Sequence, residues 1–223
     1  MYVRIEDLYF GYTKNTHVLH NVSFAMQEGE IVAILGSSGS GKSTLLRLLS
    51  GLEMPSKGRI EVNEETLCSA NTFVECEKRH VGMVFQDYAL FPHMDVIKNI
   101  AFGLKHLSKD AKKGRVQAML KLINMEEKSH AFPHELSGGQ QQRIALARAL
   151  APSPDILLLD EPFSNLDEDL KTKIRHELRS IMKKTAMTAI FVTHDYDDAL
   201  DIADRICYLE DGRIVHEEVI KRS

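Results

Sequence analysis

Eight residues near the start of the chain have the types and spacing needed to hold a row of phosphates. Gly36-Ser37-Ser38-Gly39-Ser40-Gly41-Lys42-Ser43 follows an apolar run and precedes a leucine-rich helical pattern. Its glycines let successive backbone N–H groups converge on an anion, and the N-terminus of the following helix adds partial positive charge. Lys42 would supply a full charge, and the Ser43 hydroxyl suits Mg²⁺. The segment therefore predicts nucleotide binding, without identifying the reaction.

A pair of carboxylates ends a second apolar run. Ile156–Leu159 is followed directly by Asp160 and Glu161. At the carboxyl edge of a parallel sheet such a pair emerges beside a phosphate loop, and adjacent strand residues point to opposite sides. We expect Asp160 to face Mg²⁺ and Glu161 to act as the general base that polarises an attacking water.

A second glycine-rich turn stands at Leu136-Ser137-Gly138-Gly139-Gln140. Ser137 with Gln140 three residues later also fits a capping box, which would simply start a helix. A capping box does not explain two consecutive glycines, each of which weakens the first helical turn by roughly 1 kcal/mol relative to Ala. Exposed backbone N–H groups at this turn would form a second anion site, one that could serve the nucleotide of another subunit.

These groups need a framework of strands and helices to bring them together. Apolar runs at Ile31–Leu35, Val81–Phe85, Ile156–Leu159 and Ala189–Val192 predict buried strands of a parallel sheet. Helical patterns lie between these runs. The first, Thr44–Ser50, stops at a glycine. Two later patterns each place apolar residues on one helical face, the first with Leu166, Leu170, Ile174, Leu178 and Ile181, and the second with Ala199, Leu200 and Ala203. The alternation predicts an α/β fold with a mainly parallel sheet.

The two ends of this pattern differ from its middle. Residues 2–10 and 18–26 alternate in polarity around a glycine-containing turn, which predicts an antiparallel β-subdomain at the N-terminus. The stretch 87–150 holds three helical patterns and no evident strand. We therefore interpret residues 1–223 as one domain, in which a core of residues 1–86 and 151–223 carries an inserted helical subdomain, 87–150.

Composition narrows the possible partners. The 223 residues contain 28 Lys and Arg against 32 Asp and Glu, a net charge of −4, so nucleic acid is not an expected partner. Three cysteines, none spaced as C-x-x-C, favour a reducing compartment without disulfides. With no signal peptide and no long apolar run, we expect a soluble chain, in which any membrane role must come through a partner.

Taken together, the three motifs resemble the Walker A, signature and Walker B elements of an ABC transporter ATPase, a P-loop NTPase. Smaller elements of that family find matches in the family's order. Tyr12 resembles the aromatic residue that stacks on adenine, Gln86 the Q-loop glutamine, and His194 the switch histidine. Ser164-Asn165-Leu166-Asp167 resembles the D-loop, with Asn165 where Ala is commoner.

The resemblance implies a head-to-tail dimer of two copies that hold two ATP molecules between them. Each ATP would contact Tyr12 and residues 36–44, including Thr44, of one copy, and residues 137–140 with Asp167 of the other. The resemblance further implies Mg²⁺ on Ser43, Gln86 and Asp160. Lys42 would neutralise phosphate charge, Glu161 and His194 would orient water and the γ-phosphate, and Gln86 would link the nucleotide to the helical subdomain.

The residues after Gln86 resemble the segment of bacterial import ATPases that receives a helix from a membrane permease subunit, here Gln86–Leu104. The similarity points to importers for ferric iron, polyamines, sulfate, sugars or phosphonates, and favours ferric iron. The resemblance implies an extracytoplasmic binding protein as an indirect partner and a location at the cytoplasmic face of the cell membrane. Relatives usually carry a further C-terminal regulatory domain, which is not expected here because the chain stops at Ser223.

Two rival functions remain open from the residues. A soluble ABC-type ATPase that acts on nucleic acid or the ribosome usually has two cassettes in one chain or a long coiled-coil insertion, and neither is visible here. A P-loop kinase would leave Leu136–Gln140 and His194 without a role.

Overall fold

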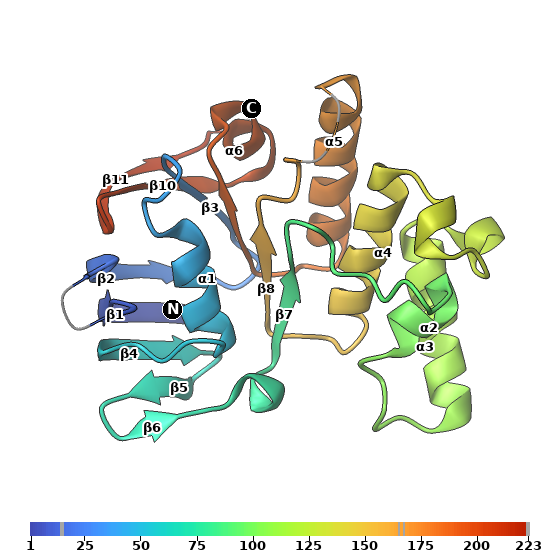
Figure 1. Cartoon of the computed structure of the whole chain (residues 1–223), viewed down its shortest axis with the longest axis horizontal. Helices are drawn as coiled ribbons and strands as arrows, with labels where there is room; N and C mark the ends of the chain where they lie inside the picture. Colours follow the sequence, from blue (N-terminus) through green and yellow to red (C-terminus); the bar gives the residue numbers. More distant parts are fainter. Residues whose placement is uncertain (14–15, 165, 167, 222–223) are drawn as a thin grey trace.

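The structure is a computed structural model, and it describes residues 1–13, 16–164, 166 and 168–221, with no side-chain description for 168–170. Two β-sheets and a group of helices make up the fold (Figure 1). One sheet has the strand order β2-β1-β4-β5-β6 and is antiparallel, with strands Val3–Phe10 (β1), Leu19–Met26 (β2), Lys57–Val62 (β4), Glu65–Ser69 (β5) and Thr72–Phe73 (β6).

The second sheet has the order β11-β10-β3-β9-β8-β7 and is parallel except at one edge. Its strands are Ile31–Leu35 (β3), Val81–Val84 (β7), Ile156–Asp160 (β8), Ala189–Thr193 (β9), Arg205–Glu210 (β10) and Arg213–Val219 (β11). Only the β10–β11 pair runs antiparallel. The predicted α/β class with a mainly parallel sheet is confirmed.

Each of the four predicted apolar runs forms one of the parallel strands. β7 ends one residue early, at Val84, whereas β8 and β9 each extend one residue further, to Asp160 and Thr193. The predicted N-terminal antiparallel pair is confirmed as β1 and β2, but it belongs to a five-stranded sheet. Strands β4 to β6, β10 and β11 escaped prediction because polar residues interrupt their apolar pattern.

The central strands are buried on both faces, and alternate residues enter different cores. In β8, Ile156 and Leu158 join one hydrophobic cluster while Leu157 and Leu159 join the other. β3 divides in the same way, with Val32 in one cluster and Ala33 in the other. Because successive side chains of a strand point to opposite faces, a continuous apolar run is what a doubly covered sheet requires.

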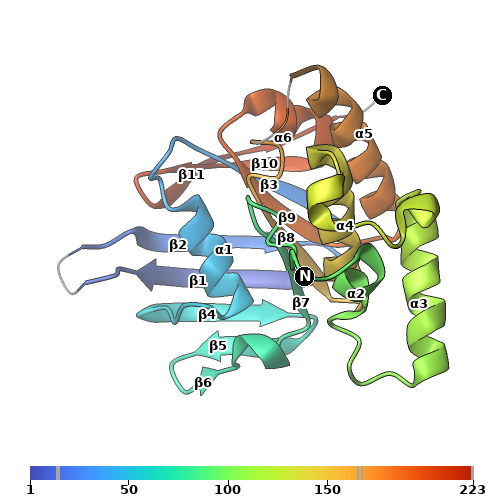
Figure 2. The same ribbon diagram turned by 45° about the vertical axis from the view of Figure 1, so that its right-hand side comes forward.

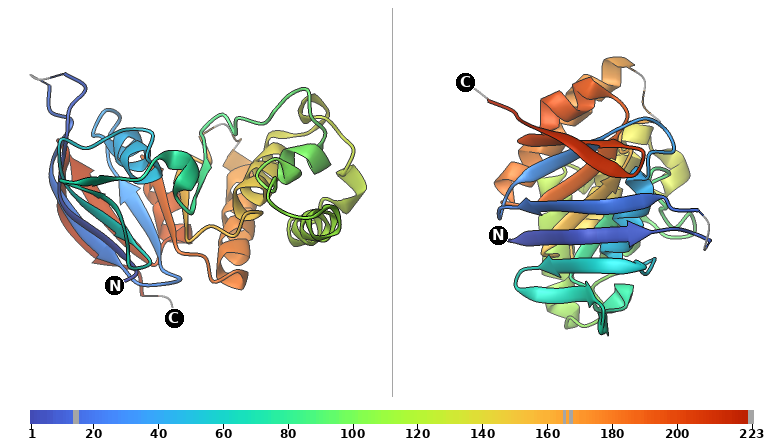
Figure 3. Two further views of the ribbon diagram at one scale, coloured as in Figure 1. Left: turned by 90° about the horizontal axis from the view of Figure 1, so that it is seen from below. Right: turned by 90° about the vertical axis from the view of Figure 1, so that its left-hand side faces the viewer.

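Helix α1, Lys42–Ser50, is packed between the two sheets. Its leucines share a cluster with the inner faces of β1, β2 and β4 and with one face of the parallel sheet. It ends where Gly51 takes a left-handed conformation, φ 81°, as the leucine run followed by glycine predicted. Figure 3 shows the antiparallel sheet at one end of the molecule and a group of helices at the other.

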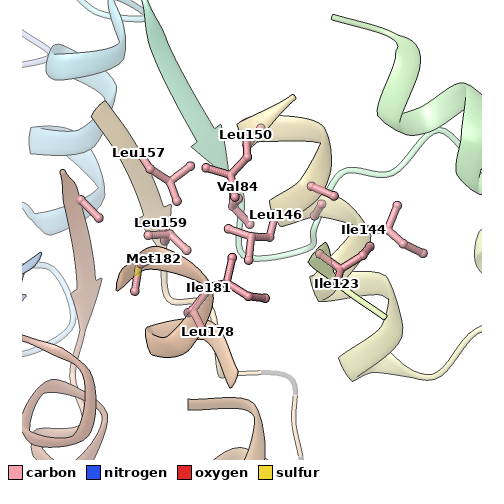
Figure 4. Packing of buried hydrophobic residues seen from close by; sticks show 14 of the residues in the cluster. Val84, Ile123, Ile144, Leu146, Leu150, Leu157, Leu159, Leu178, Ile181 and Met182 are labelled. Atoms are coloured by element: carbon pink, nitrogen blue, oxygen red, sulfur yellow. The ribbon is translucent and has the colours of Figure 1, made fainter. Parts of the chain in front are cut away.

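The opposite face of the parallel sheet is covered by helices Gly138–Leu150 (α4), Glu168–Lys184 (α5) and Tyr196–Ile202 (α6) (Figure 4). Helices Val96–Ala101 (α2) and Lys109–Leu122 (α3) lie beyond α4 (Figure 2). Three short 3₁₀ turns complete the described elements, at Cys76–Lys78, Glu126–Lys128 and Pro133–Glu135. In the part of the chain described, no helix is both long and apolar enough to cross a bilayer.

One predicted helix face is partly wrong. Ala199 and Ala203 are buried as expected, but Leu200 is 38% exposed and Ile202 is buried in its place. Neighbouring residues of a helix point about 100° apart, so Leu200 turns away when Ala199 faces the core. In α5, Ile174, Leu178 and Ile181 are buried as predicted, as is Leu166 ahead of the helix, while Leu170 lies outside the described side chains.

The buried strand β8 should carry a large share of the stability of the protein. Leu158→Ala deletes a fully buried side chain and is expected to lower the free energy of unfolding by about 3 kcal/mol, measured by urea denaturation. Leu52→Ala, at a position 43% exposed, is the control and should cost about 0.5 kcal/mol. Equal losses in the two variants would contradict the two-core packing.

Candidate active site

The candidate phosphate loop, residues 36–41, joins β3 to α1. Gly41 is the N-cap of α1 with φ 104°, a conformation that strains any other residue, and a Cβ there would lie 2.7 Å from Leu19 Cδ2. Gly39 has φ 82°, and a Cβ there would meet no atom within 4 Å. The loop thus leads into a helix N-terminus, and the space beside Gly39 is open, as the approach of an anion to the backbone requires.

Lys42 lies within the curve of this loop. Its ammonium donates hydrogen bonds of 2.9 Å to the carbonyl oxygens of Gly36 and Ser37, and the residue is 5% exposed. Burial lowers the pKa of Lys42, against the opposing attraction of Glu161 and Asp160. A buried cation solvated mainly by carbonyl dipoles is suited to binding an anion.

Four parallel strands deliver their carboxyl ends to the edge of the sheet at which this loop begins. β3 leads into Gly36, β8 into Glu161, β9 into His194, and β7, through Phe85, into Gln86. Register keeps the ends level, since Leu35 pairs with Thr193 and Asp160 with Val192. Residues far apart in sequence therefore meet at one edge, which in open parallel sheets is where ligands bind.

Asp160 faces α1. The Ser43 hydroxyl donates a 2.8 Å hydrogen bond to Asp160 Oδ1. Burial raises the pKa of Asp160, although the Ser43 hydrogen bond opposes that shift. A hydroxyl and a carboxylate oxygen so close together are the donor types that Mg²⁺ prefers. Among the described residues no group of three His, Cys, Asp or Glu side chains is placed to hold a metal ion.

The side chain of Glu161 points away from Ser43 and toward His194. Its Oε2 lies 3.3 Å from Nδ1 of His194, and its backbone has φ 41°, a left-handed conformation that glutamate rarely adopts. The Ser164 hydroxyl donates a 3.0 Å hydrogen bond to the Glu161 carbonyl oxygen, which helps to hold the turn. The two adjacent acids thus face different partners. Strain at a residue beside a phosphate loop is a feature of functional sites.

Tyr12 and Gln86 lie near this edge from different elements. Tyr12 Oη is 3.3 Å from Oγ1 of Thr44, in the first turn of α1, and its ring packs edge-on against Phe10 at 4.9 Å. More than half of the Tyr12 residue surface remains exposed, enough for a flat ring to stack on it. Gln86 is exposed two residues after β7.

The second glycine-rich turn does not adjoin the phosphate loop of its own chain. Ser137 is the N-cap of α4, and its pairing with Gln140 completes the predicted capping box. Gly138 and Gly139 form the first helical turn. α1 and α4 pack on opposite faces of the parallel sheet (Figure 1). Asn165 and Asp167 of the candidate D-loop lie outside the described residues.

One ion pair beside the site was not predicted from the sequence motifs. Arg175 of α5 is buried and pairs with Asp198 of α6, which also accepts a hydrogen bond from Thr193 next to His194. The only indication in the sequence was an arginine directly beside the apolar face of α5, next to Ile174. Nothing local showed which acid it would meet.

Comparison with known proteins identifies the family to which this chain is similar. Residues 19–164 match the family model described as ABC transporter. The chain is 48% identical over 200 residues to the Fe(3+) ions import ATP-binding protein FbpC 2 of Haemophilus influenzae, covering 89% of this chain and 56% of that protein. It is 47% identical over 199 residues to a probable sulfate/thiosulfate import ATP-binding protein CysA of Chlorella vulgaris, covering 88% and 83%. The chain thus spans little more than half the length of the Haemophilus relative.

Solved structures agree over nearly the whole chain. The structure of cbiO1 from Clostridium perfringens, described as part of the ABC transporter complex cbiONQ, superposes with a TM-score of 0.89 at 32% identity, covering 99% of this chain and 89% of that one. A dimeric post-hydrolysis state of the ATP-binding cassette MJ0796, bound to ADP and Pi, superposes with a TM-score of 0.82 at 31% identity, covering 99% and 100%.

The charge on Asp160 should destabilise the protein when nothing is bound. A raised pKa means that folding favours the protonated carboxyl, so at pH 7 the charged form costs stability and a neutral isostere removes that cost. Asp160→Asn should raise the thermal unfolding midpoint of the nucleotide-free protein at pH 7 by a few degrees, measured by calorimetry.

Asp204→Asn is the matched control with the opposite sign. Burial alone would raise the pKa of Asp204, but hydrogen bonds from Lys183, the Ile31 N–H and Arg179 hold it below its ordinary value. Its charge therefore stabilises the fold at pH 7, and this variant should melt at a lower temperature. A lower midpoint for Asp160→Asn as well would show that the Asp160 charge is not a cost.

Proposed function

Because the chain belongs to the ABC transporter family and is an ABC ATPase, we propose that it is the ATP-hydrolysing subunit of an importer and works as a dimer on membrane permease subunits. The observation that carries the proposal is the meeting of the phosphate loop, the Ser43–Asp160 pair and the Glu161–His194 pair at one edge of the sheet. That arrangement can bind a triphosphate, hold a divalent cation and orient a water.

ATP would bind through its phosphates to the amide groups of residues 36–44 and to Lys42. The fit is supported by Lys42, whose ammonium is held within the loop by the carbonyl oxygens of Gly36 and Ser37. Burial disfavours its positive charge and lowers its pKa, and a phosphate oxygen would offset that cost. Tyr12 would stack on the adenine ring from above Thr44.

Ser43 and Asp160 would hold Mg²⁺, joined by Gln86 from the end of β7. The ion would neutralise charge on the phosphates and fix their orientation. Asp160 would bind the ion as a carboxylate, and Ser43 would bind it through its hydroxyl oxygen. Both residues already stand at hydrogen-bond distance, so little rearrangement is needed.

Glu161 would accept a proton from the attacking water, and His194 would hold the Glu161 carboxylate and approach the γ-phosphate. The 3.3 Å separation of their side chains supports this division of roles. Hydrolysis of the phosphoanhydride bond between the β- and γ-phosphates depends mainly on positioning and on charge neutralisation. Rigid strand ends would provide the positioning, and Lys42 with the divalent cation would neutralise the charge.

The other half of each ATP site would come from a second copy of the chain. The turn at Ser137–Gln140 stands on α4, across the sheet from the α1 phosphate loop, so a partner copy is needed to bring such a turn to each nucleotide. Asp167 would contribute from the same partner surface. The dimeric cassette MJ0796 supports a pairing of this kind.

Membrane permease subunits would dock on the segment Gln86–Leu104. A groove of about 640 Å³ opens beside this segment, lined by β7 and the residues before it, by Phe91 and Phe102 on either side of α2, and by the end of α4. Aromatic rings line it, with Phe91 and Phe102 in contact at 4.4 Å and the Arg148 guanidinium 5.4 Å from the Phe91 ring. An apolar aromatic groove is the surface into which an amphipathic helix inserts.

In this proposal, residues 1–86 and 151–223 form the nucleotide-binding core, and residues 87–150 form a helical subdomain that contacts the permease. Permeases would hold the protein at the cytoplasmic face of the membrane, with an extracytoplasmic binding protein as an indirect partner. Ferric iron is the substrate we favour, on the similarity to the Haemophilus protein, and sulfate is the alternative that the Chlorella protein supports.

Glu161→Gln should separate nucleotide binding from hydrolysis. The variant keeps the shape of the site but loses the base, so turnover is expected to fall at least about 100-fold while ATP affinity changes little. It should accumulate an ATP-bound dimer, measured by size-exclusion chromatography with Mg²⁺ and ATP. Ordinary turnover in this variant would remove Glu161 from its role.

Ser137→Arg tests the shared site. The bulky cation at the α4 N-cap should leave ATP binding by single protomers intact but prevent the ATP-dependent dimer of the Glu161→Gln protein, measured on the same column. Ser108→Arg is the matched control, because Ser108 caps the N-terminus of α3 in the same way and should still allow dimers. Dimers of normal yield from the Ser137 variant would contradict the proposed pairing.

The transport role is tested by co-purification from the native membrane. A permease that co-purifies with the chain, and is lost when Phe91 and Phe102 are both replaced by Ala, supports an importer. Co-purification with ribosomes or nucleic acid instead would favour a non-transport ATPase.

A further inference from the structure

The side chain of His194 makes few contacts that could fix its position. Its side chain is 60% exposed and lies 3.3 Å from Glu161, a distance at the limit of a hydrogen bond. The residue stands in the short connection between β9 and α6, just after Thr193 and just before the N-cap of α6. Its position must therefore be set by whatever holds the backbone on either side.

Both flanking residues are tied to one carboxylate on α6. The Thr193 hydroxyl donates a 2.9 Å hydrogen bond to Asp198 Oδ2 and accepts one of 3.0 Å from the backbone N–H of Asp195. Thr193 and Asp198 are both buried. A single hydroxyl thus links the residue before His194, the residue after it and Asp198.

Asp198 is held in turn from α5. Arg175 Nε lies 2.6 Å from Asp198 Oδ1, and Nη2 lies 2.5 Å from the same oxygen. The guanidinium also reaches Asp195 Oδ2 at 3.5 Å and Asp201 Oδ2 at 3.4 Å. With 4% of its side chain exposed, Arg175 joins α5 to three acids of the segment that follows His194.

Stability alone does not account for this pair. Desolvating two charges costs about as much as their attraction returns, and apolar residues of similar size would often serve the fold as well. What the charged pair adds is direction, because a planar guanidinium fixes a carboxylate in one orientation. Asp198 and Thr193 also line the same small cavity as Glu161 and His194. The carboxylate that Arg175 orients therefore lies in the wall of the candidate site.

We propose that Arg175, acting through Asp198 and Thr193, is a positioning residue that holds His194 in register with Glu161 for ATP hydrolysis. The inference rests on the proposed roles of Glu161 and His194. Arg175 itself touches neither nucleotide nor water in this scheme.

The chain contains its own control one helical turn further along α5. Arg179 makes the same kind of ion pair, 3.0 Å from Asp204 Oδ1, and donates to the carbonyl oxygen of Ile202 at the far end of α6. It anchors the same two helices without contacting the segment around His194. Loss of Arg179 therefore reports what weaker packing of α6 does by itself.

The experiment measures steady-state ATPase activity of Arg175→Lys, Thr193→Val and Arg179→Lys, each also in a His194→Ala background. Lysine keeps the charge but cannot direct the carboxylate, and valine removes only the hydroxyl. We expect kcat to fall about 10- to 100-fold in Arg175→Lys and Thr193→Val, with KM for ATP within about twofold of the parent. Arg179→Lys should keep kcat within about twofold.

In the His194→Ala background, Arg175→Lys and Thr193→Val should lower kcat no further than about twofold, since the residue they position is gone. Full additional losses there, a normal kcat in both single variants, or a rise in KM in place of the fall in kcat would each overturn the inference. Normal turnover of His194→Ala alone would instead overturn the proposed role of His194. Thermal unfolding checks that the variants are folded, and Thr193→Val decides the test if Arg175→Lys is not.

Discussion

Parallel pairing of β7, β8, β9 and β3 is the constraint on which the rest of the molecule depends. Parallel strands in register finish at one edge, so the residues that follow them are brought together however far apart they lie in sequence. Leu35 pairs with Thr193, Asp160 with Val192 and Val84 with Leu159, which keeps all four ends level. A slip of one residue in any strand would exchange the side chains that face the two cores and would move the residue that follows its carboxyl end out of register.

Burial at this edge of the sheet disfavours the charged forms of Lys42 and Asp160, and this favours ligand binding. Desolvation lowers the pKa of Lys42 and raises the pKa of Asp160, so folding opposes the charged form of each. A triphosphate would bring negative charge to Lys42, and a divalent cation would bring positive charge to Asp160. Ligand binding would then relieve a cost that the fold already carries, which favours tight binding of the two ligands together.

Helix α4 connects the two surfaces on which transport would depend. Ser137 caps its N-terminus at the glycine-rich turn, and Arg148 near its C-terminus donates hydrogen bonds to the carbonyl oxygens of Tyr88 and Ala89. Tyr88 and Ala89 both have positive φ and lie two and three residues after Gln86. A continuous helix therefore links the segment beside the aromatic groove to the turn proposed to face a partner copy. A helix transmits displacement along its length because its backbone hydrogen bonds resist bending.

The sequence by itself determined whatever depends on neighbouring residues. The phosphate loop, the capping box at Ser137, the four apolar strands and the paired acids at Asp160 and Glu161 are local patterns, so their conformations follow from glycine content, capping and periodicity. Tertiary structure decided which strand lies beside which, that Ser43 meets Asp160, and that Glu161 meets His194.

Tertiary structure also decided the features that local patterns misplaced or missed. Leu200 faces outward because a short helix buries only one narrow side, and β10 and β11 form because the parallel sheet and each other supply their hydrogen-bond partners. Arg175 meets Asp198 across a separation of 23 residues, which no spacing rule anticipates. Contacts between elements depend on packing of the whole chain, whereas the motifs depend on a few adjacent residues.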